Sequence, residues 1–243
     1  MSIIQGILSF ISLTIFSALC GLHYFGHLSA KYDCETSYTF EKDWGNLQRH
    51  SSSNTQLLGS TNEVVFMGDS ITDRMNISML FPNKPYVNRG IGGQITSQML
   101  LRFRSDVINL HPRVVVILGG TNDLKKMKKY HPIEGILENV KSMAELARVN
   151  NIQVIIASLL PVCGEKADGR PPFDILRVNK LLFEYASQNG IIYLDYFYAL
   201  VGSDGLLKQE LTTDCLHINE AGYMIMAPFA EAAIQKAQKT NSN

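Results

Sequence analysis

The sequence predicts an α/β protein in which helices cover both faces of a central parallel sheet, a three-layer α/β/α arrangement. Short apolar runs recur along the chain, and segments with helical spacing of their apolar residues separate them. An apolar run without polar alternation indicates a strand buried on both faces, and strands that alternate with helices favour a parallel sheet. Because no internal repeat is visible, we expect a single domain of this kind.

Five apolar runs are the expected strands of this sheet. They are short, rich in Val and Ile, and bounded by glycine, proline or polar residues, as buried strands are. In chain order the runs are Val64–Met67, Tyr86–Asn88, Arg113–Leu118, Ile152–Ala157 and Ile191–Leu194.

Helices are expected between these strands. The segment Thr96–Leu110 has its apolar residues at helical spacing, and the proline after His111 ends it. A short amphipathic helix is expected within Phe40–Leu57, with Trp44 and Leu47 on its apolar side. The other expected helices are Pro132–Val149, Phe173–Gln188, a short one after Asp195, and Glu220–Lys236.

The N-terminal part of the chain differs from the rest. Residues 1–30 contain no Asp, Glu, Lys or Arg, and the apolar stretch Ile3–Phe25 is close to the roughly 20 residues that span a bilayer. We expect a signal peptide or membrane anchor here, with a buried core helix as the alternative. The protein would then be secreted or held in the cell envelope, associated with a membrane through residues 3–25. A linker with a short helix follows at residues 31–62, and the main domain covers residues 63–243.

Composition excludes several classes of function. Lys and Arg number 22, as do Asp and Glu, and no basic stripe is interleaved with aromatic residues, so we expect no nucleic-acid partner. The four cysteines form no C-x-x-C pair and lack the spacing of a zinc site. The cysteines therefore do not indicate a zinc site.

Polar residues and glycines follow the first three strands directly. Ser70 comes after the first strand, Gly93 after the second and Asn122 after the third. The carboxyl ends of parallel strands share one edge of a sheet, where open α/β proteins bind their ligands. A serine hydroxyl becomes a good nucleophile only when a neighbouring base takes its proton. The question is whether the chain supplies that base.

A base and an orienting acid are present in the loop before the last helix. Asp214 and His217 are three residues apart, so the carboxylate is able to hold one imidazole nitrogen while the other faces Ser70. A histidine with an unperturbed pKa of about 6.5 is a usable base at neutral pH. The N–H groups of Ser70 and Gly93 and the Asn122 amide are candidate donors to an oxyanion.

Each of these signals has a simpler structural interpretation when it stands alone. A Gly-Asp-Ser sequence is a common turn, and Asp214 and His217 are compatible with a surface pair. Asp195, a second candidate acid, fits better as a helix cap. The lysines between 125 and 129 fit a solvated loop, with binding of anionic substrates as the alternative. Arg170 is a candidate for the acyl or leaving-group side of the site.

Four blocks in this order resemble the SGNH hydrolases, also called GDSL-type esterases and lipases. The resemblance covers Glu63 to Ala237, and one departure is Cys215, where many members carry Gly. It implies a flavodoxin-like parallel sheet and a serine hydrolase that uses neither a metal nor a cofactor. Ser70 would be the nucleophile, Asp214 and His217 the acid and base, and Ser70, Gly93 and Asn122 the oxyanion hole. The blocks are Gly68-Asp69-Ser70, Gly92-Gly93, Gly120-Thr121-Asn122-Asp123 and Asp214-Cys215-Leu216-His217.

The resulting hypothesis is a serine esterase that cleaves carboxylic esters through an acyl-enzyme on Ser70. Substrates in the family range over lysophospholipids, short-chain and aryl esters and acetylated sugars, so the expected partner is a small-molecule, lipid or carbohydrate ester. Two alternatives remain: a non-catalytic binding domain that retains the fold, and an acyltransferase that uses the same residues.

Overall fold

The five predicted strands are confirmed, and in this computed structural model they form one parallel sheet in the order β2-β1-β3-β4-β5. Each strand begins and ends within two residues of its predicted position. The strands are β1 (Val64–Gly68), β2 (Tyr86–Gly90), β3 (Val114–Leu118), β4 (Gln153–Ala157) and β5 (Ile192–Leu194).

The structure describes residues 43–126, 133–164 and 169–240. The predicted signal peptide or anchor at residues 1–30 lies outside these ranges, and so does most of the predicted linker. No helix within the described ranges is long and apolar enough to cross a bilayer. The chain divides after Trp44 into two units, and the second, which begins at Gly45, contains the sheet and its helices.

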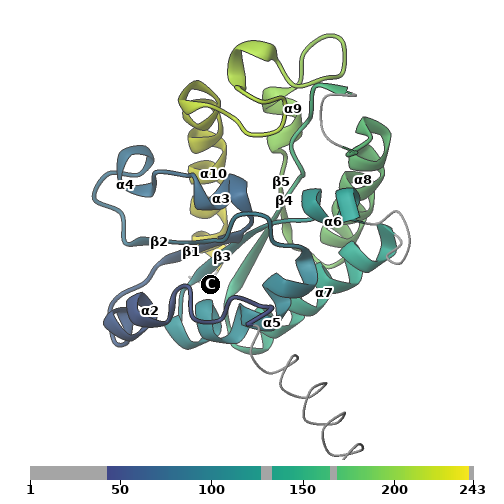
Figure 1. The fold of residues 1–243 in the computed structure, drawn as a ribbon. Coiled ribbons are helices and arrows are strands. Elements are labelled where there is room, and N and C mark those ends of the chain that lie inside the picture. Colours follow the sequence, from purple (N-terminus) through teal and green to yellow (C-terminus); the bar gives the residue numbers. More distant parts are fainter. Residues whose placement is uncertain (1–42, 127–132, 165–168, 241–243) are drawn as a thin grey trace, which may run out of the picture. The chain divides into compact units, whose positions relative to one another are not determined.

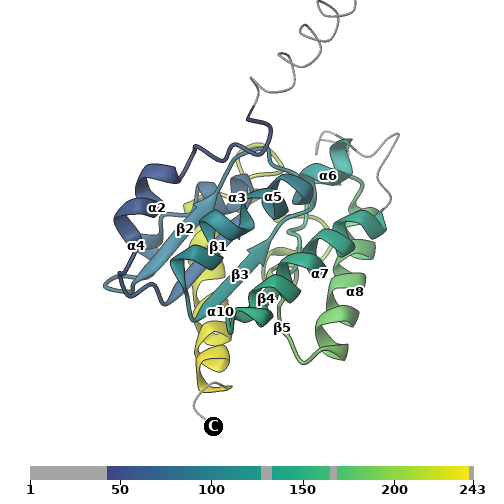
Figure 2. The same cartoon turned by 90° about the horizontal axis from the view of Figure 1, so that it is seen from below.

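Four long helices cover the two faces of the sheet. Helices α5, α7 and α8 pack side by side on one face, and α10 lies against β3, β4 and β5 on the other (Figures 1 and 2). This arrangement confirms the predicted three layers. The bounds are Thr96–Asp106 for α5, Ile133–Val149 for α7, Pro172–Gln188 for α8 and Glu220–Thr240 for α10.

The central strands β1 and β3 carry no polar side chain because both of their faces are buried. In β1, Val65 and Met67 belong to the core cluster under α5, α7 and α8. Their neighbours Val64 and Phe66 belong to the cluster under α10. Successive side chains of a strand point to opposite faces, so a strand between two helical layers needs apolar residues at every position.

Two predicted helices are shorter in the structure. The helix that begins at Thr96 ends at Asp106, and after Val107 (φ −127°) the chain makes a separate 3₁₀ turn over Ile108–Leu110. The predicted helix within Phe40–Leu57 forms only over its last turns.

That shorter helix, α2 (Ser51–Leu57), is held by a polar anchor in place of the predicted apolar side. Leu47 precedes the helix and is 41% exposed. The Asn54 side chain is buried and donates to Asp106 Oδ1 at 2.6 Å and to the Ser105 carbonyl at 3.2 Å. A buried amide with paired donors fixes α2 on α5 where the apolar pattern is weak.

The remaining helices are short. Asp195 accepts a hydrogen bond from the Tyr198 N–H at 3.0 Å, which confirms its predicted role as a cap. Of the predicted lysine loop, Lys125 lies at the end of a helix and is exposed, while residues 127–132 lie outside the described ranges. The short helices are α3 (Ser70–Asp73), α4 (Ile77–Leu80), α6 (Thr121–Lys126), α9 (Tyr196–Leu200) and the 3₁₀ turn Gln209–Leu211.

The strand order creates a crevice at the carboxyl edge of the sheet. Strand β1 lies between β2 and β3, and the registers Gly68–Gly90 and Gly68–Leu118 bring the three strand ends level. The chain leaves β1 and β3 toward different neighbours, which is the topological switch point where open α/β sheets bind ligands. Ser70 lies at this point.

Candidate active site

Ser70 is the first residue of α3, and the two residues before it explain how the strand turns into the helix. The Asp69 carboxyl accepts a hydrogen bond from the Ile71 N–H at 3.0 Å and so caps α3. A Cβ on Gly68 would lie 2.0 Å from Thr72 Oγ1, so only glycine lets α3 fold back so closely. The Gly-Asp-Ser sequence therefore places Ser70 at the strand end.

The predicted base contacts this serine, and the predicted acid contacts the base. His217 Nε2 lies 2.9 Å from Ser70 Oγ, and His217 Nδ1 lies 2.6 Å from Asp214 Oδ2. The second carboxylate oxygen, Asp214 Oδ1, accepts the backbone N–H groups of His217 at 2.7 Å and Leu216 at 3.1 Å. One aspartate thus holds both the loop and the ring, with one imidazole nitrogen facing the serine.

The two carboxyl groups of the site have opposite pKa shifts. Partial burial opposes ionisation of Asp214, but the hydrogen bonds from the His217 ring and from the His217 and Leu216 N–H groups outweigh it and lower the pKa of Asp214 to about 2. Complete burial raises the pKa of Asp69 to about 6, since a charge without water is unfavourable. Asp214 is therefore an anion at neutral pH.

Cys215 lies between the acid and the base. Its backbone is in the left-handed region with φ +66°, which favours glycine. This conformation gives a physical reason why glycine suits the position and why a small side chain is tolerated there.

A glycine-containing loop after β2 forms one wall of the site. The Gly92 N–H donates to Asp73 Oδ2 at 3.2 Å, which ties the loop to α3. Gly93 has φ +75°, and a Cβ there would meet no atom within 4 Å. The backbone conformation, rather than lack of space, requires glycine at this position. Both glycines line the same cleft as Ser70 and His217.

Asn122 reaches the cleft from α6, directly after β3. Its side chain is almost completely buried. Nδ2 donates one hydrogen bond to the Gln94 carbonyl at 3.0 Å, and Oδ1 accepts one from Arg170 Nη2 at 3.0 Å. The carboxamide is therefore held at both ends beside the serine.

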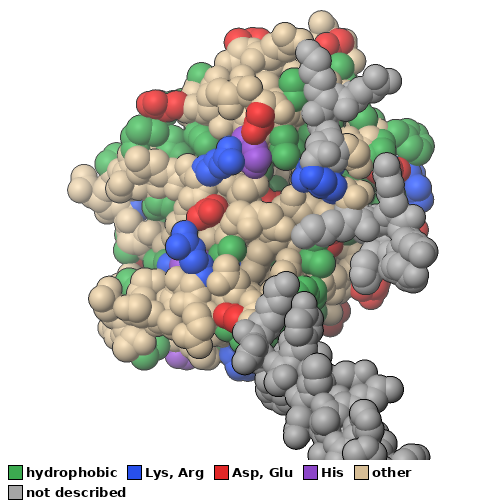
Figure 3. Space-filling view, viewed as in Figure 1, with side chains coloured by type: hydrophobic (Ala, Val, Ile, Leu, Met, Phe, Trp, Pro, Cys, Tyr) green, Lys and Arg blue, Asp and Glu red, His purple; other side chains and the backbone are tan. Residues whose placement is uncertain are grey.

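Four of the five predicted site residues line a single cleft of about 540 Å³ at the carboxyl edge of the sheet. Figure 3 shows this face, on which a histidine lies among acidic and basic side chains. The lining residues are Ser70, Asp73, Arg74, Gly92, Gly93, Asn122, Lys125, Arg170, Leu216 and His217, and Asp214 contacts the cleft through His217.

Sequence reasoning missed a buried arginine that holds the strand ends. Arg102 is fully buried and donates to the carbonyls of Gly68 and Arg89 at 2.9 Å. It also bonds Gln94 Oε1 at 2.6 Å and pairs with Asp106 at 2.9 Å. Opposite charges four residues apart, in phase with a buried apolar stripe, are the signal that could have identified it.

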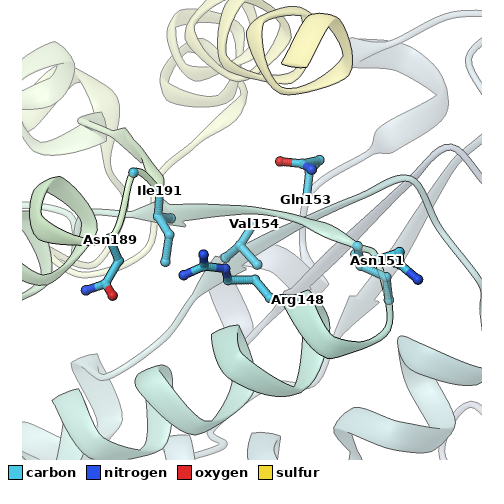
Figure 4. Close-up of a pocket in the computed structure, with 8 residues that line it drawn as sticks. Arg148, Asn151, Gln153, Val154, Asn189 and Ile191 are labelled. Atoms are coloured by element: carbon cyan, nitrogen blue, oxygen red, sulfur yellow. The ribbon is translucent and has the colours of Figure 1, made fainter. Parts of the chain in front are cut away.

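A second hollow, of about 230 Å³, lies at the opposite edge of the sheet. It forms where α7 and α8 end and β4 and β5 begin, and Figure 4 shows Arg148, Asn189 and Ile191 around it. None of the predicted site residues lines it. In the part of the chain that the structure describes, no three His, Cys, Asp or Glu side chains come together as a metal site would require.

Comparison with known proteins agrees with this fold. The sequence model of the GDSL-like Lipase/Acylhydrolase family matches residues 66–225. The rat platelet-activating factor acetylhydrolase IB subunit alpha1 is 29% identical over 175 residues, which cover 66% of this chain and 70% of the rat protein.

Two solved structures match a larger part of the chain than the rat protein does. A putative acylhydrolase from Bacteroides fragilis is 38% identical, with a TM-score of 0.75 over 80% of this chain and 98% of the other. A GDSL-like lipase from Bacteroides thetaiotaomicron is 36% identical, with a TM-score of 0.74 over 80% of this chain and all of the other. The chain belongs to the GDSL-like lipase/acylhydrolase family.

Proposed function

We propose that the protein is a serine esterase that cleaves carboxylic esters through an acyl-enzyme on Ser70. One observation carries the proposal: Ser70 Oγ, the His217 ring and the Asp214 carboxylate form a continuous chain of contacts of 2.9 and 2.6 Å. The family supports a hydrolase that acts on esters. A serine with a histidine base and an orienting carboxylate is the arrangement that acyl transfer requires.

In the proposed reaction His217 Nε2 accepts the Ser70 proton while Oγ attacks the ester carbonyl. The ionised Asp214 stabilises the imidazolium that forms. The oxyanion receives hydrogen bonds from the N–H groups of Ser70 and Gly93 and from Asn122 Nδ2. His217 then returns the proton to the departing alcohol. In the second half-reaction it takes a proton from water, whose oxygen attacks the acyl-enzyme carbonyl. His217 then gives that proton to Ser70 Oγ as the bond to the acyl group breaks and the acid leaves.

The cleft supports a short acyl group. Among the described residues that line it, Leu216 is the one with a hydrophobic side chain, and the others are glycines or carry polar or charged groups. A long acyl chain needs an apolar channel to leave water, whereas an acetyl group does not. The rat relative is named as an acetylhydrolase, which is consistent with this choice. Acetyl esters are therefore the first substrates to test.

The test is hydrolysis of p-nitrophenyl acetate, butyrate and octanoate by the full chain and by Ser70→Ala and His217→Ala. Far-UV circular dichroism and thermal melting show that the variants are folded. We expect turnover by the wild-type protein, fastest with acetate, and background rates for both variants. Equal turnover by wild type and Ser70→Ala would refute the proposed nucleophile, and preference for octanoate would refute the short acyl group.

A further inference from the structure

The two ends of the Asn122 carboxamide have the same shape but opposite hydrogen-bonding roles. Only the Nδ2 end is able to donate to an oxyanion, and if the amide turned over, the Oδ1 end would repel it. Something in the fold must therefore determine which end faces Ser70. Nδ2 carries two hydrogens, and one of them is bonded to the Gln94 carbonyl. The described residues show no acceptor for the other.

Arg170 is positioned to determine which end of the Asn122 amide faces Ser70. It comes from the segment that connects β4 to α8, and its side chain is 5% exposed. Nη2 donates to Asn122 Oδ1 at 3.0 Å, and Nε donates to the carbonyl of Thr121, the preceding residue, at 3.1 Å. A guanidinium has five N–H donors and no acceptor, so it pairs with the oxygen end of an amide and never with the nitrogen end.

We propose that Arg170 is a positioning residue, which fixes the Asn122 carboxamide with Oδ1 turned away from the cleft and one Nδ2 hydrogen turned toward the oxyanion. The inference rests on the proposed function, in which Asn122 is an oxyanion donor. Arg170 and the Gln94 carbonyl act together, since the guanidinium donates only to the oxygen end and the carbonyl accepts only from the nitrogen end. Charge on the guanidinium further polarises the amide and strengthens its N–H as a donor.

The size of the expected effect follows from what remains when Arg170 is removed. Loss of an oxyanion donor lowers kcat by about 10²- to 10³-fold, which is the expectation for Asn122→Ala. In Arg170→Met the bond from Nδ2 to the Gln94 carbonyl persists, so the amide is misdirected only part of the time. We expect kcat to fall by about 10-fold, a tenth or less of the full donor effect. KM stays within about twofold, because the lost interaction belongs to the transition state.

The experiment is a double-mutant cycle on p-nitrophenyl acetate with Asn122→Ala, Arg170→Met and the double variant. Arg170→Lys is measured as the conservative change, because it keeps the charge but reaches one acceptor at a time. Arg177→Met is the matched control: this arginine, on α8, has a half-exposed side chain and lies 4.0 Å from Glu134. Thermal melting accompanies every variant.

If Arg170 acts through Asn122, Arg170→Met lowers kcat in the wild-type background but has no further effect on Asn122→Ala. Arg170→Lys gives an intermediate kcat, and Arg177→Met leaves kcat unchanged. Additive losses would overturn the inference, and so would a raised KM with unchanged kcat, which would mark a substrate contact instead. Should Arg170→Met not fold, the same cycle with Arg170→Lys decides. Failure of Asn122→Ala to lower kcat would refute the proposed oxyanion hole itself, a separate outcome.

Discussion

Asp69, the residue before the proposed nucleophile, allows a direct test of the energetics of this strand end. Its carboxyl group is completely buried, and burial raises its pKa from 3.8 to about 6. Nearby Asp123 acts in the same direction, and Arg170 opposes it. A shift of about two units corresponds to about 3 kcal/mol, at 1.36 kcal/mol per unit.

The direction in which stability changes with pH follows from proton binding. Between pH 4 and 6 the folded protein holds the Asp69 proton and the unfolded chain does not, so the contribution of Asp69 to stability decreases as pH rises. Above pH 6 ionisation costs the full 3 kcal/mol or so. In Asp69→Asn the side-chain oxygen still accepts the Ile71 N–H, but no charge is buried. We therefore expect this variant to be more stable than wild type at pH 8 and equally stable at pH 4.

Urea denaturation of both proteins between pH 4 and 8 measures the difference in the free energy of unfolding. Other groups titrate in both proteins, and subtraction removes their contribution. The expected difference grows from near zero at pH 4 to about 3 kcal/mol at pH 8. A difference independent of pH, or a variant that is less stable at pH 8, would refute the claim that burial raises the pKa of Asp69.

Other predictions follow from single contacts. Asp214→Asn keeps acceptors for the loop but cannot balance the imidazolium, so kcat should fall by about 10²- to 10⁴-fold, measured with p-nitrophenyl acetate. With a pKa of about 2, Asp214 stays ionised from pH 4 to 9. Any fall of the wild-type kcat/KM at the acid end of that range therefore belongs to another group. An acid limb that is present in the wild-type profile and absent only in that of Asp214→Asn would contradict this. A Cβ on Gly90 would lie 2.0 Å from the Asp73 nitrogen, so Gly90→Ala should lower the free energy of unfolding by more than about 3 kcal/mol. Gly135→Ala in α7, where the new Cβ meets nothing, should raise it by about 0.5 kcal/mol in the same urea assay; the opposite order would contradict the packing.

The sheet could be predicted because the apolar pattern of a buried strand lies within the strand's own residues. A strand between two helical layers must be apolar at every position, so Val64–Met67 and Arg113–Leu118 are visible in the sequence without knowledge of their neighbours. The short helices α3 and α6 were not predicted. Each spans too few residues to show a 3.6-residue pattern. Each forms where the chain turns just after the end of a strand.

Ser70 and His217 lie 147 residues apart, yet their meeting could be predicted. Both follow elements that end at one edge of the sheet, and a serine with no base nearby would have no chemical role there. The orientation of the Asn122 amide could not be predicted. It depends on Arg170, which is 48 residues further along the chain, and an isolated charged residue usually indicates an exposed position. Arg102 was also missed because charged residues are usually exposed, although its partner Asp106, four residues along, was visible in the sequence.

The most direct test of the account is covalent labelling by a fluorophosphonate, which reacts only with a serine whose proton is taken by a base. Intact-mass spectrometry of the full chain, Ser70→Ala and His217→Ala, each shown to be folded, gives the extent of labelling with time. The account predicts stoichiometric labelling of the wild-type protein on Ser70, none of Ser70→Ala, and labelling of His217→Ala slowed by orders of magnitude. Equal labelling of wild type and His217→Ala, or none in the folded wild type, would contradict an activated serine at this strand end.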